Sequence, residues 1–374
     1  MVTFFAALCG CVENGDSPDL DEALVIELRW IKSYPDERRS DIETGLLWTL
    51  SFLGADLSRD EPSPISWADN LVILRLDRAG FNSESLSSWA VLISAMKASQ
   101  EYAVNGSFDI GRFVALTLCS PHHYYALTGA SSRYEDARAR YRFDPQPVAV
   151  IESSVAYGNR LVEIPEGDSS ADFAYIAHEG VGSIQQGSFR VVEHELLDLM
   201  PNGQLRFALY DLAGELKHSA DDTLTAAGKP SKCLWCHETE LSRPFMGRTS
   251  VSGYHSLNEF EARIAGQSEM LEAARARLRS RIDFSRKQDH TLAEFLYLGF
   301  YAPSAERVSV EWNVSVERAR EILEGLPTHA HDEFPVLGAE LYQRSNVDPL
   351  APYEVIEVPK DPRESSVNEP NLLR

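Results

Sequence analysis

The chain has 374 residues, of which 44% are hydrophobic and 25% charged, a balance typical of folded proteins. Its length allows two or three domains, or one large one. The net charge of −22 argues against nucleic acid and against an anionic membrane surface as partners. An acidic surface favours a basic partner protein, or simply solubility, and no stretch is long and apolar enough for a transmembrane helix.

The chain begins with MVTFFAALCGC, an apolar run that ends in Cys11. This run resembles a bacterial lipoprotein signal, in which the final cysteine is lipidated and becomes the mature N-terminus. The resemblance implies export and a lipid anchor through Cys11, with residues 1–18 as a truncated signal and tether. No Lys or Arg precedes the run, and it is short for a signal peptide, which an upstream start codon would explain. The alternative is a frayed or buried apolar N-terminus.

Residues 19–145 are expected to form a mainly helical domain. Helices are predicted where apolar or charged residues recur at helical spacing, over 40–53, 84–102, 110–118 and 131–142. The first of them opens with a capping box, Ser40-x-x-Glu43. The run 70–77, NLVILRLD, predicts a strand within this region.

Two histidines, His122 and His123, stand in the sequence PHHYY after the predicted helix 110–118. Paired histidines and tyrosines can bind a metal or contact a cofactor, but such a cluster is more often a packed loop with hydrogen-bonded rings. We therefore expect a loop at this point.

Residues 146–225 are expected to form a small antiparallel sheet. Short β-type runs occur at 148–151, 173–176 and 189–192. Asn202-Gly203 lies between two apolar runs, which is the strongest short-range signal for a hairpin. The pairs at 178–179 and 194–195 are both His-Glu but do not extend to H-E-x-x-H, so the sequence excludes a zinc protease of that type.

The most specific motif is Cys233-Leu234-Trp235-Cys236-His237, a C-x-x-C-H run. Haem carries two vinyl groups on neighbouring pyrrole rings, and each can form a thioether with a thiol. Cysteines three positions apart lie on one face of a helical turn, so both sulfurs can reach the same porphyrin edge. The imidazole of His237 would then bind the iron as an axial ligand.

Three other interpretations fit parts of this motif. A zinc site would use Cys233, Cys236 and His237, but structural zinc usually takes four ligands, and the sequence has no second pair at short spacing. A thioredoxin-like pair is expected directly after an apolar strand, whereas residues 217–222 are polar. A structural disulfide or a chance match is the third interpretation.

At these motif positions the chain resembles c-type cytochromes. The resemblance covers only a short segment, and it implies one covalently attached haem c, assembly outside the cytoplasm, and redox or ligand-sensing work. Taken with the lipoprotein-like start, the sequence is similar to exported bacterial proteins. This similarity implies a periplasmic, outer-membrane or cell-surface location.

The sixth position of a haem iron has several candidate ligands in this sequence. Met246 lies in a loop-like stretch close to the motif, and His255 has an easier path to the iron. Another residue, or no protein ligand, are the remaining alternatives. Arg243 and Arg248 flank Met246, and their guanidinium groups suit the carboxylates of the haem propionates.

The expected fold class is α+β. An N-terminal helical domain (19–145) would precede a small central antiparallel sheet (146–225), a C-terminal helical haem-bearing region (226–345) and an extended tail (346–374). In the third of these regions, Ser256-x-x-Glu259 predicts the start of a long helix that reaches about residue 282.

The main functional hypothesis is an exported c-type haem protein that acts in electron transfer or haem-based redox sensing. One alternative is a peroxidase-like enzyme with an open sixth position, in which His122, His123 or His255 would serve as the acid–base residue. Another is a non-redox binding lipoprotein whose cysteine pair is only a disulfide or a metal clip.

Overall fold

The computed structural model describes residues 23–58, 61–167, 169–238, 241, 251–284, 292–364 and 369–374. Within these residues the chain forms helices and two sheets, which confirms the predicted α+β class. The signal-like segment with Cys11 lies outside the described residues, as do Met246 and its neighbours Arg243 and Arg248.

The first sheet has four short strands in the order β2-β3-β1-β4. Its strands are β1 (Val25–Arg29), β2 (Ile65–Ala68), β3 (Leu71–Arg75) and β4 (Phe108–Asp109). The strand predicted at 70–77 is β3, which pairs antiparallel with both β1 and β2. β1 pairs in parallel with the distant β4. The N-terminal part therefore combines the expected helices with a sheet of which the sequence reveals one strand.

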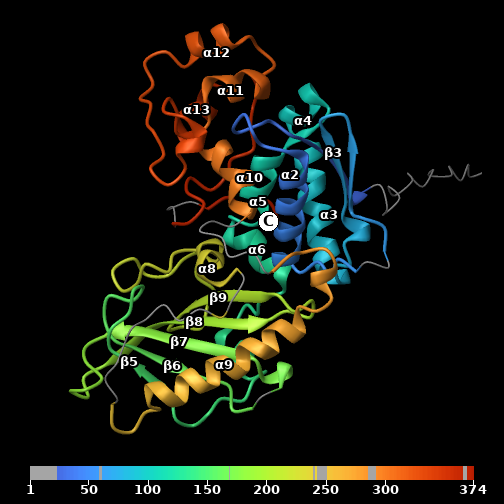
Figure 1. The fold of residues 1–374 in the computed structure, drawn as a ribbon. Helices are drawn as coiled ribbons and strands as arrows, with labels where there is room; N and C mark the ends of the chain where they lie inside the picture. Colours follow the sequence, from blue (N-terminus) through green and yellow to red (C-terminus); the bar gives the residue numbers. More distant parts are fainter. Residues whose placement is uncertain are drawn as a thin grey trace, which may run out of the picture.

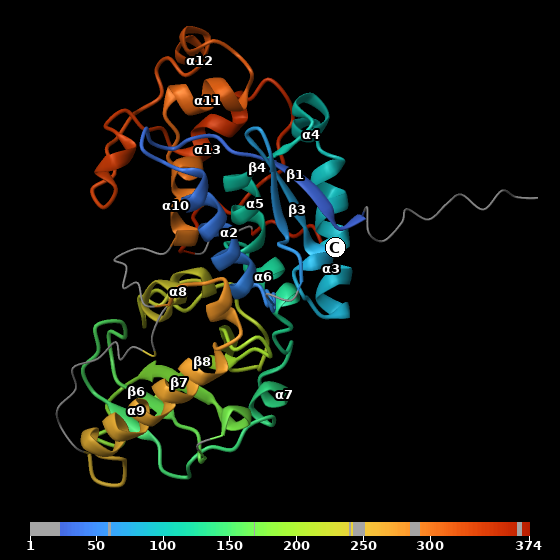
Figure 2. The same ribbon diagram turned by 45° about the vertical axis from the view of Figure 1, so that its right-hand side comes forward.

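Five helices pack around this sheet (Figures 1 and 2). They are α2 (Arg39–Phe52), α3 (Ser83–Lys97), α4 (Gln100–Asn105), α5 (Ile110–Thr117) and α6 (Pro121–Thr128). The predicted cap of α2 is wrong by two residues, because Asp41, rather than Glu43, accepts the backbone N–H of Arg38 at 3.2 Å. The PHHYY sequence is not a loop: Pro121 occupies the first turn of α6, where its missing N–H costs nothing.

The second sheet is antiparallel throughout and has the order β5-β6-β7-β8-β9. Its strands are β5 (Val148–Val150), β6 (Arg160–Glu163), β7 (Ala174–Val181), β8 (Arg190–Leu199) and β9 (Leu205–Asp211). The charged helix expected at 131–142 is shorter than predicted, since only α7 (Tyr134–Arg138) forms there.

The predicted hairpin at Asn202-Gly203 joins β8 to β9. Gly203 has a φ of +86°, and an added Cβ would lie 2.2 Å from the carbonyl oxygen of Ala274, so only glycine fits this turn. The side-chain amide of Asn202 donates to the carbonyl oxygens of Ser51 and Ala55, each at 2.8 Å. The turn thereby ties the second sheet to the end of α2.

The C-terminal part is helical, as expected. It contains α8 (Pro230–His237), α9 (Leu257–Ala274), α10 (Leu292–Tyr301), α11 (Ala305–Glu311), α12 (Val316–Ile322) and α13 (Arg344–Val347). The capping box of α9 forms as predicted, with the Ser256 hydroxyl accepting from the Glu259 N–H. Helix α9 crosses the five-stranded sheet, and α10 packs against α2 and α5 (Figure 1). Short 3-10 turns occur at Leu76–Arg78, Ser170–Asp172, Leu278–Ser280, Pro335–Leu337 and Asp348–Leu350.

One large cluster of buried apolar residues extends through both sheets and their helices, from Leu24 to Val358. A smaller cluster around Trp312 holds α11, α12 and α13 together. The two sheets thus share a continuous apolar core, and the cavity described below lies on the second sheet.

The segment expected as an extended tail, 346–374, begins with the end of α13 and the 3-10 turn Asp348–Leu350, and it has no helix or strand over 351–364 and 369–374. It is nevertheless packed into the fold. The Lys229 ammonium group is fully buried between the carboxylate of Glu369, at 2.7 Å, and the carbonyl oxygen of Asp361, at 2.8 Å. The N–H of Leu372 donates to Nε2 of His123 at 2.8 Å. These contacts hold the residue that directly precedes α8.

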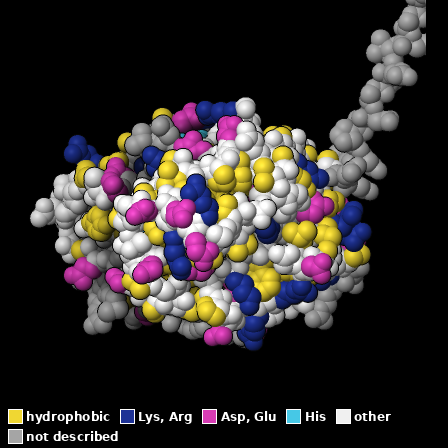
Figure 3. Space-filling view, turned by 90° about the horizontal axis from the view of Figure 1, so that it is seen from above, with side chains coloured by type: hydrophobic (Ala, Val, Ile, Leu, Met, Phe, Trp, Pro, Cys, Tyr) yellow, Lys and Arg dark blue, Asp and Glu magenta, His cyan; other side chains and the backbone are white. Residues whose placement is uncertain are grey.

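The molecular surface carries charges of both signs. Seen from the α11–α12 end, acidic and basic side chains alternate, so the acidic excess is not gathered into one patch on this face (Figure 3). Among the helices that the structure describes, none has the length and apolar character needed to cross a bilayer.

A pair of histidines on the second sheet gives the fold a predictable response to acid. His178 and His194 are cross-strand partners whose Nδ1 atoms lie 2.7 Å apart, and Nε2 of His178 lies 3.0 Å from the Glu163 carboxylate. The ring of Tyr134 stacks on His194 at 4.0 Å. Burial, followed by the neighbouring His178, lowers the pKa of His194 to about 4.

We expect acidification from pH 7.5 to 5 to destabilise the protein through His194. The unfolded histidine takes up a proton near pH 6.5 and the folded one only near 4, so the unfolded state binds more protons between these values and stability falls with pH. Allowing for partial exposure, the loss is on the order of 1 kcal/mol. Urea unfolding of the wild type and of His194→Gln at both pH values measures it. An equal loss in the variant would contradict the assignment.

Candidate functional site

The C-x-x-C-H motif lies on the short helix α8. Lys229 precedes the helix and Pro230 occupies its first turn, where proline is favoured. Cys233 and Cys236 are one turn apart on this helix, and Sγ of Cys233 lies 3.7 Å from the Lys229 carbonyl oxygen. His237 is the last helical residue. The helical conformation expected from the spacing is therefore present, with both thiols and the imidazole displayed along one short segment.

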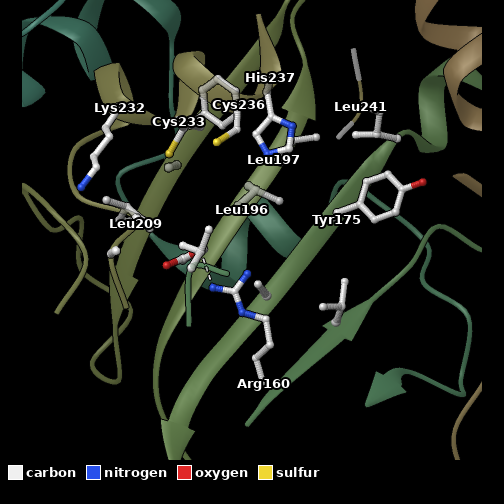
Figure 4. A pocket seen from close by; sticks show the side chains of 18 of the residues that line it. Arg160, Tyr175, Leu196, Leu197, Leu209, Lys232, Cys233, Cys236, His237 and Leu241 are labelled. Atoms are coloured by element: carbon white, nitrogen blue, oxygen red, sulfur yellow. Dashed lines mark ion pairs between the residues drawn. The ribbon is translucent and has the colours of Figure 1, made fainter. Parts of the chain in front are cut away.

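All three motif side chains line one cavity of about 470 Å³ between α8, α9 and the five-stranded sheet. Figure 4 shows Cys233, Cys236 and His237 along one side of it, with Leu196, Leu197 and Tyr175 on the facing wall. The volume lies within the range of about 300–1,000 Å³ that ligand pockets occupy. Most of the lining is apolar: Val155, Val162, Ala177, Phe207, Ala208, Leu209, Ala226, Ala227, Leu241, Phe260 and Ile264 complete the apolar part.

The two thiols differ in exposure: Cys236 is exposed, and Cys233 is half-buried. Burial raises the pKa of Cys233 well above its usual range, and burial also raises the pKa of Cys236. Thioredoxin-like pairs need the opposite shift, because the thiolate is the reactive form. The described cysteines, Cys119, Cys233 and Cys236, are all free thiols. The raised pKa values therefore disfavour the thiolate form of both residues.

The donor residues of the cavity can be set against what a metal ion and what haem require. Among the described residues, no group of three or more His, Cys, Asp or Glu side chains is arranged to hold a metal. Haem needs less from the protein: two thiols on one turn, one imidazole and an apolar slot. Cys233, Cys236 and His237 supply these donors, and the ring of Phe207 lies 5.8 Å from that of His237.

The other histidines considered from the sequence lie elsewhere. Nε2 of His255 is 3.2 Å from the Asp144 carboxylate, and the backbone N–H of His255 donates to the carbonyl oxygen of Pro147. These contacts fix the segment just before α9. The ring of His122 contacts His218, with centroids 4.2 Å apart. His123 is buried beneath the C-terminal segment. None of the three lines the described cavity, and Met246 lies outside the described residues.

Sequence reasoning missed a charged group on the cavity floor. Arg160 on β6 points its guanidinium group into the cavity (Figure 4) and is only 5% exposed. It forms ion pairs with Glu179 on β7 and, at 3.6 Å, with Glu195 on β8. The sequence does contain charged residues on three strands. That they all face the cavity can be recognised only once the strand register is known.

Comparison of the chain with protein families, with curated proteins and with solved structures finds no match. The chemistry of the cavity is therefore the basis for assigning a function.

Proposed function

We propose that this chain is an exported c-type haem protein in which α8 and the cavity beneath it hold one covalent haem c. The observation that carries the proposal is the convergence of Cys233, Cys236 and His237 on a single, largely apolar cavity. The two thiols would anchor the porphyrin edge, and His237 would bind the iron. When bound, haem supplies one-electron redox chemistry and an iron that can take an external ligand.

Electron transfer or haem-based redox sensing is the role that we propose first. The apolar walls formed by residues such as Phe207, Leu197 and Phe260 would exclude water from the porphyrin. Burial and the second axial ligand set the potential of such a site. A redox partner with a basic docking surface would complement the net charge of −22.

The polar floor of the cavity supports a second candidate, in which the sixth position is open. Among the described residues that line the cavity, the sole histidine is His237, and methionine is absent. The polar floor formed by Arg160 and Glu195 supplies hydrogen-bonding groups for a small ligand. These features support the second candidate, an enzyme or sensor that binds an exogenous ligand, although not with His122, His123 or His255 as the acid–base residue.

The location follows from the same chemistry. Attachment of haem to a C-x-x-C-H motif takes place outside the cytoplasm in bacteria, and the apolar start of the chain resembles a lipoprotein signal. We therefore propose a periplasmic or cell-surface protein, anchored through a lipid on Cys11.

Visible spectroscopy of protein exported from a host with haem-maturation machinery tests the proposal. We expect a sharp c-type α band in the reduced-minus-oxidised spectrum. Carbon monoxide should shift the reduced spectrum if the sixth position is open, and should leave it unchanged if Met246 or another side chain occupies it. A colourless protein from this host would contradict haem binding and favour a lipoprotein with another ligand.

A further inference from the structure

Two carboxylates share one guanidinium nitrogen at the floor of the cavity. Nη2 of Arg160 forms ion pairs with both Glu179 and Glu195, the latter at 3.6 Å. Arg160 and Glu179 are direct cross-strand partners, and Glu195 lies one strand further on. Arg160 is 5% exposed and Glu179 is 1% exposed. Two acids thus compete for a single cation at a site where Glu179 is buried and the Glu195 side chain is 16% exposed.

The neighbouring charges do not relieve this imbalance. Glu193 is also buried, but it already has its own cation, Lys217, and accepts the Asp221 N–H at 3.0 Å. Lys232, on α8 above the cavity, pairs with Glu364. The charged and titratable groups around the Glu179–Glu195 pair and in the cavity that Glu195 lines are Arg160, Glu193, Lys217, Lys232, Cys233, Cys236 and His237. Three carboxylates, those of Glu179, Glu193 and Glu195, thus share two cations, Arg160 and Lys217, because Lys232 is paired with Glu364.

We propose that Glu179 and Glu195 form a proton-binding site that is coupled to the redox state of the cavity. The inference rests on the proposed function. Reduction of a bound haem by one electron would add a negative charge to the cavity, and one proton from solvent would then bind the carboxylate pair. The electron comes from the reductant and the proton from water, so the net charge of the cavity is unchanged.

The electrostatics of the pair support this inference. Burial, and then the second carboxylate, raises the pKa of Glu179 far above that of an ordinary glutamate, and burial also raises the pKa of Glu195. Like charges that share a buried site cannot both ionise easily. A further negative charge in the same weakly screened cavity favours the protonated form still more.

Redox titration of the haem-loaded protein at several pH values between 6 and 9 tests the coupling. In the wild type the midpoint potential should fall by up to about 59 mV for each tenfold decrease in proton concentration. Glu179→Gln and Glu195→Gln should each flatten this dependence, because the remaining carboxylate then has Arg160 to itself. Glutamine is close in shape to a protonated glutamate, so both variants should fold.

Glu163→Gln is the matched control. Glu163 lies on β6 like Arg160, but on the face of the sheet opposite to the cavity, where its carboxylate is 3.0 Å from Nε2 of His178. It should keep the wild-type slope. A loaded wild type with a pH-independent potential overturns the coupling, as does a slope that persists in both variants. In unloaded protein at pH 7, the infrared difference between wild type and Glu179→Gln should contain a protonated-carboxyl band; its absence overturns the proton site itself. Failure to load haem is a separate result that refutes the proposed function and the coupling with it.

Discussion

Replacement of Cys236 by alanine is expected to remove the mass increment of one haem from the exported protein, together with its reduced α band. In the proposed attachment both thiols would hold the porphyrin edge, because Cys233 and Cys236 lie one turn apart on a helix that packs against β9. Without the Cys236 thiol, the porphyrin would no longer be fixed beside His237. Intact-mass spectrometry of the exported variant measures the effect directly.

Cys119→Ala is the matched control for this experiment. Cys119 is a free and almost fully buried thiol between α5 and α6, and it does not line the cavity. The control variant should therefore retain one covalent haem. Retention of covalent haem by Cys236→Ala, or its loss from Cys119→Ala, would contradict the role given to α8.

Replacement of Arg112 by alanine is expected to destabilise the fold by about 3–5 kcal/mol. The Arg112 side chain is completely buried on α5, and its Nε lies 3.0 Å from Glu101. Its two Nη atoms reach Glu311 at 3.5 Å, Asp348 at 2.9 Å and the carbonyl oxygen of Ile356 at 2.8 Å. Removal of the guanidinium group leaves the fully buried Glu101 with only Arg29, at 3.8 Å, and leaves the Ile356 carbonyl oxygen without its donor, while Glu311 and Asp348 keep Arg344. A buried acid without a close cation costs far more than the lost attraction between exposed charges. Urea unfolding at pH 7 measures the change.

Arg318→Ala provides the comparison for an exposed ion pair. Arg318 and Glu321 are 2.9 Å apart on α12, but their side chains are 61% and 65% exposed. Solvent screening limits such a pair to roughly 0.5 kcal/mol. A similar loss of stability in the two variants would show that the buried network contributes no more than a surface pair.

Local sequence signals predicted the elements that depend on few neighbours. The Ser256–Glu259 capping box, the Asn202-Gly203 hairpin and the helix carrying the C-x-x-C-H motif were all predicted and are all present. In the capping box the deciding contacts lie within a few residues along the chain, whereas the turn also contacts the distant Ser51, Ala55 and Ala274. Spacing alone was not sufficient at Ser40-x-x-Glu43, where the cap forms two residues earlier.

Elements that depend on distant partners were harder to predict. Strand β1 was missed because it is stabilised by pairing with β3 and with the parallel strand β4. The local sequence VIELR does not reveal these partners. The PHHYY segment was predicted as a loop, although Pro121 is equally compatible with the first turn of a helix. Tertiary packing decided both outcomes.

The candidate site divides in the same way. The motif indicated the three residues on α8, but not the cavity that they line. Arg160, Glu179 and Glu195 come from three strands, and only the register of β6, β7 and β8 brings them together. The sequence alone does not show which charged strand residues will be buried on the inward face of the sheet.

The burial of Lys229 by Glu369 and the Asp361 carbonyl has a consequence for biogenesis. In the export that we propose, a polypeptide threaded from its N-terminus would deliver Cys233 and Cys236 well before the segment that binds Lys229. The residue that precedes α8 would then gain its buried partners only after the last part of the chain has arrived. Attachment of a cofactor to α8 would have that interval in which to take place.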